Sequence, residues 1–573
     1  QSEGGAIYNE KGTLIIGESQ DYDGTVKGVK FTNNGINANS EVTTNRGGAI
    51  YNATGATTIV ESTKTKFSGN SAIKEGGAIY NATGATLEIK DGVSIGSIDD
   101  KANNAKLGGG VFNAGSLKLA EGTSFVNNTA FNGGGLYLKK GSTVNADAAG
   151  LNHLSKVTFE GNSADYGAGL FVDEDVDIFL DNVMFKGNST SGLGSAFYNQ
   201  GKLTLGENNT FFNNSGSLIG NSGELIFTKN FTIDGSKKGN EGNTSFITNE
   251  ENGVVKITTE NGTSLDINAI GDGTADGAAI SLLDKSTITT DGVAKTLKNA
   301  IFTKNKGKNG GAIYKESTED LTIGNTKFDG NNAVAKGGAI YNAKGSTVTI
   351  DADTKFTNNN ANVAGGAIYN AEGGTLTFAK GYKGFANANS KNYSTGNGGA
   401  VSNDGVMNIY YDDANPDSII FSNQGKDLAT GNGGALHLGA KSIVKTNDTS
   451  KTDSNGYEVG YIKNGVFSNN TANNGGALFN ESNLVLEDTM FSGNKSGTAG
   501  GAIYNKGNVI DGRDYGILDI ILSENKTLYN NKSDDKGGAI YNEGGTVNII
   551  AKSGSTPTIS GNTAHNQGGV VAS

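Results

Sequence analysis

The chain has 573 residues, of which 89 are Gly and only 2 are Pro, and 35% of its residues are hydrophobic. This composition excludes collagen-like and Pro-rich disordered chains, and the lack of Cys excludes disulfides and thiol chemistry and fits an exported chain. The net charge is −12, and the chain has only two Arg residues, Arg46 and Arg513, which argues against nucleic-acid binding. No apolar run is long enough to span a membrane as a helix.

The hexapeptide Gly-Gly-Ala-Ile-Tyr-Asn recurs from one end of the sequence to the other. It stands, among other places, at residues 4–9, 47–52, 76–81, 500–505 and 537–542, with looser copies between them. A motif that returns in this way indicates one structural unit stacked many times.

A second motif, Phe-x-x-Asn, accompanies the first, for example at 67–70, 302–305 and 328–331. A third segment of alternating apolar residues lies between them, as at 85–89 and 346–350, and is typical of a short strand. The motifs predict an all-β fold, a single-stranded parallel β-helix with three short strands per coil and roughly twenty coils of about 25 residues or more. A β-propeller is the alternative, but its blades need about 40 residues each.

Substitutions between copies predict which way the side chains point. The fourth place of the hexapeptide is always apolar, as at Ile50 and Val111, so it should face the core. The fifth place also accepts Ser402 and His437, so we expect its Tyr residues to form a partly solvated column outside. The sixth place should form a ladder of hydrogen-bonded Asn side chains, and the Phe of Phe-x-x-Asn an interior stack, with Leu528 and Ile559 as replacements.

The whole chain, 1–573, is predicted to be one continuous array. Residues 1–214 carry regular repeats, 215–299 degenerate repeats, and 300–573 regular repeats with long insertions. In the degenerate part, 216–221 and 245–249 still align with the hexapeptide, and the pattern resumes at 277–280.

The longest insertions span 138–156, 408–418, 439–463 and 506–525. They are expected at one corner, after the second strand and before the Phe, as a row of loops along one side that could form a binding face. Because both ends of the sequence fall within a coil, we expect a segment of a longer protein, or ends that pair into a filament.

Groups suited to catalysis or metal binding are sparse. His153, His437 and His565 are far apart in the repeats, and the Asp pairs 99–100, 412–413 and 534–535 fall in segments typical of solvated turns. The Gly-Asp-Gly at 271–273 lacks the repeated context of a calcium-binding β-helix. The sequence therefore predicts no enzyme activity, no metal and no cofactor.

The joint repetition of GGA[ILV] and FxxN over nearly the whole chain resembles the chlamydial polymorphic membrane proteins and related Gram-negative autotransporter passengers. The resemblance implies a right-handed β-helix displayed outside the outer membrane and used for adhesion.

Taken with that resemblance, the sequence predicts an extracellular adhesin or stalk segment that binds a host or bacterial cell-surface protein or glycan through loops and exposed aromatic columns. The alternatives are a purely structural filament or surface-layer component, with end-to-end or lateral self-association, and a polysaccharide-acting enzyme. The candidate binding residues are Tyr8, Tyr51, Tyr80, Tyr314, Tyr341, Tyr369, Tyr504, Tyr541, Tyr457 and Tyr461. Burial of their rings would reduce the hexapeptide to scaffold.

Overall fold

The structure is a computed structural model that describes residues 2–573 apart from 21–24, 37–40, 237–242, 260–261, 263, 387–390, 412–418, 455 and 525–526. All regular elements of this described part are β-strands, and it contains no helix that could cross a membrane. The chain divides into two compact units, residues 1–260 and 261–573.

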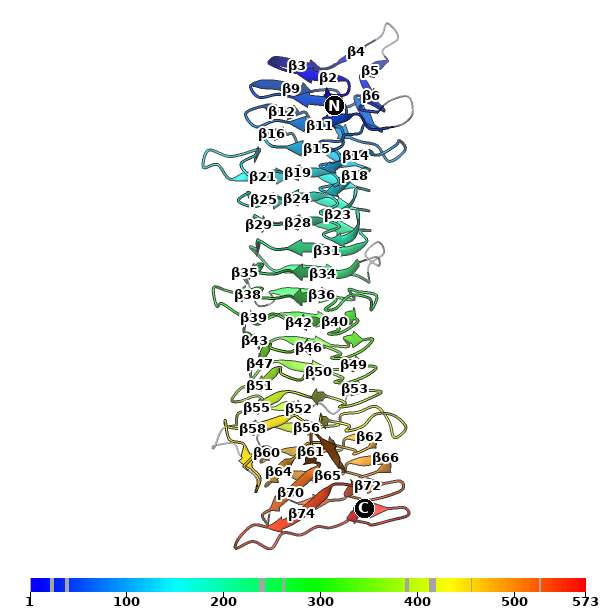
Figure 1. Cartoon of the computed structure of the whole chain (residues 1–573), viewed down its shortest axis with the longest axis vertical. Coiled ribbons are helices and arrows are strands. Elements are labelled where there is room, and N and C mark those ends of the chain that lie inside the picture. Colours follow the sequence, from blue (N-terminus) through cyan, green and yellow to red (C-terminus); the bar gives the residue numbers. More distant parts are fainter. Residues whose placement is uncertain are drawn as a thin grey trace. The chain divides into compact units, whose positions relative to one another are not determined.

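In each unit the hexapeptides form one parallel sheet, here called the first sheet, whose strands lie coil on coil (Figure 1). Its strands in the first unit are β2 (Ile7–Asn9), β8 (Ile50–Asn52), β11 (Ile79–Asn81), β15 (Val111–Asn113), β19 (Leu136–Leu138), β24 (Leu170–Val172), β28 (Phe197–Asn199), β31 (Gly216–Asn221) and β34 (Asn243–Asn249). In the second unit they are β37 (Ile280–Leu282), β42 (Ile313–Lys315), β46 (Ile340–Asn342), β50 (Ile368–Asn370), β54 (Val401–Asn403), β57 (Leu436–Leu438), β63 (Leu478–Asn480), β67 (Ile503–Lys506), β73 (Ile540–Glu543) and β76 (Val571–Ala572).

A single coil of the first unit shows the other two sheets. After β8, the chain forms β9 (Ala56–Val60), which pairs in parallel with β12 (Thr86–Ile89) of the next coil in the second sheet. It then forms β10 (Lys66–Ser68), which pairs in parallel with β6 (Lys30–Thr32) of the preceding coil in the third sheet. The second unit repeats this order, as in β46, β47 (Thr347–Ile350) and β48 (Lys355–Thr357). The predicted parallel β-helix with three short strands per coil is confirmed.

A further short strand, which the sequence did not reveal, leads from the third sheet to the glycine pair in many coils. In the first unit these strands are β14 (Asn103–Leu107), β18 (Asn128–Asn132), β23 (Ser163–Tyr166) and β27 (Ser189–Leu193). They pair in parallel with one another.

The core of each unit lies inside the coils, where the inward-facing side chains of the three sheets meet. Ile50 and Ile79 of the first sheet, Leu87 of the second and Phe67 of the third are all 0% exposed. The Phe residues stack as predicted, with ring centroids 5.1 Å apart between Phe302 and Phe328. Leu528 replaces the Phe in its coil, pairs with Phe491 and is buried.

The glycine pair satisfies two different requirements of the corner. Gly47 has φ of +63°, a conformation that L side chains avoid. Gly48 lies so close to the next coil that a Cβ would meet the carbonyl oxygen of Gly77 at 2.1 Å. The first Gly is therefore needed for its positive φ. The second Gly is needed because a side chain there would collide with the backbone of the equivalent Gly one coil away.

The Asn ladder predicted for the sixth place is present. The Asn52 amide donates to the side-chain oxygen of Asn81 at 2.8 Å, and Asn81 donates to Asn113 at 2.8 Å. Each of these amides also donates to a backbone carbonyl, such as that of Ser116 for Asn81. The ladder thus satisfies buried polar groups in several successive coils.

A second ladder, not predicted, is formed mainly by the Asn of Phe-x-x-Asn. The Asn70 amide donates to Asn103 at 2.8 Å, and Asn103 donates to Asn128 at 2.9 Å and to the carbonyl of Phe67 at 3.0 Å. The backbone N–H of Asn70 also donates to the Asn103 side chain. The Asn of this motif therefore ties the corner of one coil to the corners of its neighbours.

The insertions do not all leave the coil at one corner, and that prediction is wrong. In two coils the extra residues separate two strands of the second sheet, β20 (Thr143–Val144) from β21 (Asn152–Ser155) and β58 (Ile443–Thr446) from β60 (Glu458–Lys463). The hairpin of β68 (Asn508–Ile510) and β69 (Arg513–Tyr515) instead precedes the second-sheet strand β70 (Ile517–Leu522). Residues 412–418 of another insertion lie outside the described residues.

The degenerate stretch keeps the register of the regular repeats within each unit. Ile219 pairs with Phe197, Ile247 pairs with Ile219, and the alignment of 245–249 with the hexapeptide is confirmed. In the second unit Ile280 pairs with Ile313, as expected from 277–280. The single continuous array over 1–573 stays a prediction.

The adjacent residues Asn103 and Asn104 provide a test of the second ladder. Asn103 is 0% exposed and hydrogen-bonded on both sides, whereas Asn104 is exposed. We expect Asn103→Ala to lower the free energy of unfolding by about 2–3 kcal/mol, because it leaves buried donors and acceptors without partners. Asn104→Ala should change it by less than about 0.5 kcal/mol. Urea unfolding measures both, and equal losses would contradict a structural role of the ladder.

Candidate functional site

The fifth places of the hexapeptides form a column of rings on the face of the first sheet opposite the core. Tyr51 stacks on Tyr8 and Tyr80 with centroids 5.0 and 4.9 Å apart. The stack runs on through Phe112, Tyr137 and beyond. Both ring faces are thus occupied by neighbouring rings along the stack.

The column lies on the outer side of the sheet as expected, but much of it is less solvated than Ser402 and His437 suggested. Tyr80 is 7% and Phe112 is 1% exposed. Leu107, Tyr166 and Leu193, from or next to the short strands before the glycine pairs, pack against the column of the first unit. The substitutions that suggested solvation are accommodated by hydrogen bonds, so polarity at this place does not require water.

The ten candidate Tyr residues therefore differ in accessibility. Tyr80, Tyr369, Tyr461 and Tyr504 are buried, and Tyr51, Tyr314, Tyr341 and Tyr541 are half-buried. Only Tyr8 and Tyr457 are exposed, at 51% and 52%. The column does not offer the row of free ring faces that stacking on a sugar requires.

The phenol groups at the edge of the column bind carboxylates. The Tyr369 hydroxyl donates to Asp404 at 2.5 Å and the Tyr504 hydroxyl to Glu543 at 2.7 Å. Burial, together with the nearby Glu75 carboxylate, raises the pKa of Tyr80 to about 12. These phenols remain protonated donors at neutral pH and hold the rings in place.

In the second unit the stack is interrupted at Ser402 and His437. His437 Nδ1 lies 2.9 Å from Ser402 Oγ, and His437 Nε2 lies 3.3 Å from the Glu481 carboxylate. Ser, His and Glu joined in this order have the groups of a nucleophile, a base and an orienting acid. Ser402 is 1% and His437 is 4% exposed, so the hydrogen-bonded chain replaces ring stacking and presents no accessible nucleophile.

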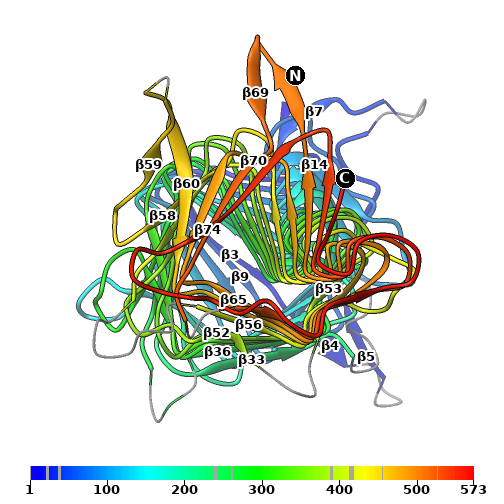
Figure 2. The ribbon, with the colours of Figure 1, turned by 90° about the horizontal axis from the view of Figure 1, so that it is seen from below.

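Two insertion hairpins of the second unit meet outside the coils. They are β59 (Lys451–Thr452) with β60, and β68 with β69, and both project away from the stacked strands (Figure 2). The Arg513 guanidinium lies 4.5 Å from the ring centroid of Tyr457 and 5.0 Å from that of Tyr515. It also approaches Asp453 at 3.7 Å.

We call residues 451–454, 456–463 and 508–515 the hairpin platform. Tyr457 and Val509 of this platform are 52% and 71% exposed. The sequence identified Tyr457 and the insertions, but the role of Arg513 was missed. The signal that could have found it is the rarity of Arg in the chain.

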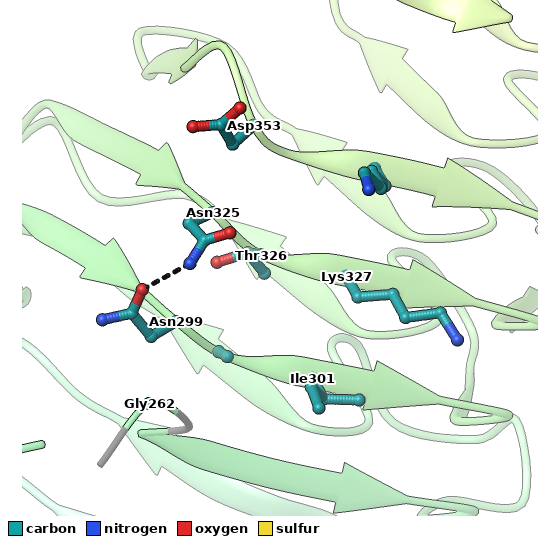
Figure 3. A pocket seen from close by; sticks show the side chains of 9 residues that line it. Gly262, Asn299, Ile301, Asn325, Thr326, Lys327 and Asp353 are labelled. Atoms are coloured by element: carbon teal, nitrogen blue, oxygen red, sulfur yellow. Dashed lines mark hydrogen bonds between the residues drawn. The ribbon is translucent and has the colours of Figure 1, made fainter. Parts of the chain in front are cut away.

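A pocket of about 370 Å³ lies over the third sheet of the second unit (Figure 3). Ile301, Lys327 and Lys355 lie in register on successive strands along it, and Asn325 donates to Asn299 at 2.8 Å. Lys327 pairs with Asp329 at 2.8 Å. Among the described residues that line the pocket there is none of the predicted Tyr residues, and the single carboxylate is that of Asp353.

The Asp residues considered for catalysis or calcium binding take part in local structure where the structure describes them. Asp99–Asp100 and Asp534–Asp535 lie in turns and bends, as predicted, and Asp412–Asp413 lies outside the described residues. The Asp272 carboxylate accepts from the N–H of Thr274 at 2.8 Å. No group of three or more His, Asp or Glu side chains in the described ranges could hold a metal ion.

Comparison with protein families finds the Chlamydia polymorphic membrane protein repeat at residues 64–82, 299–316, 353–371, 464–481, 488–506 and 519–543. The chain is a polymorphic-membrane-protein-like repeat protein. Five of the matched segments of this repeat protein hold a third-sheet Phe-x-x-Asn and the glycine pair that follows it, and the sixth has Leu528 in place of the Phe. The repeat therefore corresponds to the second ladder and the corner that joins it to the first sheet. Comparison with curated proteins finds no match.

The acid dependence of stability tests the His437–Glu481 contact in this repeat protein. The hydrogen bond from His437, with the nearby Lys506, lowers the pKa of Glu481 to about 2. Because the folded pKa lies below the unfolded one, the contact stabilises the fold above about pH 4.3 and is lost as pH falls toward 2. We expect Glu481→Gln to remove up to about 3 kcal/mol of pH-dependent stability over this window.

Urea unfolding of wild type and Glu481→Gln at pH 5 and at pH 2.5 measures that difference. Glu121→Gln, at an exposed Glu of the first unit, is the control and should follow the wild type. A Glu481→Gln variant with the same pH dependence as the wild type would refute the role of the contact.

Proposed function

We propose that the chain is a surface-exposed, adhesin-like segment, and that the hairpin platform is its binding surface for a protein or glycan on another cell. The proposal rests on one contact between two insertions. Arg513 lies between Tyr515 of its own hairpin and Tyr457 of the other hairpin. Loops without a role need no such junction, because each could be solvated separately. Exposed aromatic residues and Arg are also the side chains enriched at binding hot spots.

The repeats support a location on the cell surface, since they match those of the polymorphic membrane proteins. The coils support a role of the array as a scaffold that presents the insertions. Its Asn, Phe and Tyr side chains are largely used in contacts between coils. Differences between the coils are thus concentrated in the insertions, whose residues are not part of the ladders.

Binding of the purified chain to cultured epithelial cells and to bacterial cells tests the proposal. Saturable binding is expected, and Tyr457→Ala combined with Arg513→Ala should weaken it about tenfold or more, as for the loss of hot-spot side chains. A matched control shortens the loop between β20 and β21 in the first unit, which should leave binding unchanged.

Two outcomes would oppose this function. If no cell type binds the chain, the array is a passive spacer or a structural element. If the double variant and the control bind as the wild type does, the binding surface lies elsewhere than on the hairpin platform.

A further inference from the structure

A second pocket lies beneath the β68–β69 hairpin, where three successive corners of the second unit form a wall. It has a volume of about 400 Å³. The corners follow β50, β54 and β57 and contribute Glu372, Asp404 and the Gly439–Lys441 segment. Ile510 lines the pocket from the hairpin. Four separate segments of the chain therefore line one open, concave site.

The hairpin at the edge of this pocket makes polar contacts with neighbouring coils. Asp511 at its turn lies 3.3 Å from Lys441 Nζ. Near its base, Lys506 Nζ lies 3.2 Å from the Glu481 carboxylate, which also contacts His437. These contacts connect the turn and the base of the hairpin to neighbouring coils.

The polar groups of the pocket suit hydroxyl groups. Asp404 accepts from the Tyr369 hydroxyl at 2.5 Å, and Lys336 donates to the same hydroxyl at 2.8 Å. The other oxygen of Asp404 packs over Gly439, where a Cβ would meet it at 2.3 Å. Glu372 is exposed and lines the same pocket. Two carboxylates at adjacent corners can accept hydrogen bonds from neighbouring hydroxyls of one ligand.

The charge balance argues against an anionic ligand. Glu372, Asp404 and Asp511 are opposed by Lys336 and Lys441, and the chain carries a net charge of −12. An acidic sugar would meet repulsion from this surface. Ile510 and Ala440 offer small apolar surfaces of the kind that pack on the C–H face of a sugar ring.

We infer that this pocket is a subsite for a neutral hexopyranose at the end of a glycan. The Glu372 and Asp404 carboxylates accept the sugar hydroxyls, and Ile510 covers the ring. The inference deepens the adhesin-like role and rests on it, because it gives the hairpin platform a glycan ligand class.

Ligand-observed saturation-transfer NMR on the full chain tests the subsite. The probes are the methyl glycosides of galactose, mannose, glucose and N-acetylglucosamine, with sialic acid as the anionic probe. We expect at least one neutral glycoside to bind with millimolar affinity and sialic acid not to bind. Glu372→Gln should weaken binding about tenfold, because a charge-assisted hydrogen bond is lost. Ile510→Ala should also weaken it, and Glu121→Gln should not.

The inference is overturned if no neutral glycoside gives a signal, if sialic acid binds better, or if Glu372→Gln and Ile510→Ala both bind as the wild type does. Cell binding separates this result from the proposed function. Adhesion without any glycoside binding would leave the adhesin-like role and remove the subsite. Glycoside binding without adhesion would leave the subsite and remove the adhesin-like role.

Discussion

Each residue of this fold must pack against its own counterpart one coil away. Parallel strands in register lie about 4.8 Å apart, so every position selects side chains that can contact a copy of themselves at that distance. Rings do so by stacking, as Phe31 does on Phe67 at 4.9 Å. Amides do so by donating to the next amide, as Asn52 does to Asn81. At Gly48 no side chain can do so, because a Cβ would meet the next carbonyl at 2.1 Å.

The same constraint explains where function can reside. A ring in the column or an amide in a ladder uses its hydrogen bonds or its faces on its neighbours, and little remains for a ligand. Insertions escape the constraint because they have no copy in the next coil. The hairpin platform consists of such insertions. Arg513 forms a contact between two of them that has no counterpart in the repeat.

Much of the fold could be predicted because the need to pack against its own copy limits which residues each place of the repeat accepts. The inward Ile50, the Phe stack and the Asn ladder of the sixth place follow from which substitutions each place accepts. The same reasoning failed for the fifth place. Ser402 and His437 suggested solvent, but their polar groups bond to one another inside the stack.

The candidate site was less predictable for a physical reason. Tyr457 could be singled out as a loop aromatic, but its contact with Arg513 joins residues 56 positions apart in non-repeating segments. The pocket under Ile510 likewise depends on how far a hairpin reaches across preceding corners. No periodicity encodes such contacts, so only the three-dimensional structure reveals them.

Disulfide trapping measures the in-register stacking most directly, because the chain has no Cys of its own. Glu88 of β12 is paired with Lys118 of β16 (Ser116–Leu119), whereas Ser116 is paired with Thr86. Glu88→Cys with Lys118→Cys should form a disulfide rapidly under mild oxidation, since in-register Cα atoms lie within disulfide reach. Glu88→Cys with Ser116→Cys, shifted by two residues on the same face, should remain reduced. Faster trapping of the shifted pair would contradict the stacking on which the whole structure depends.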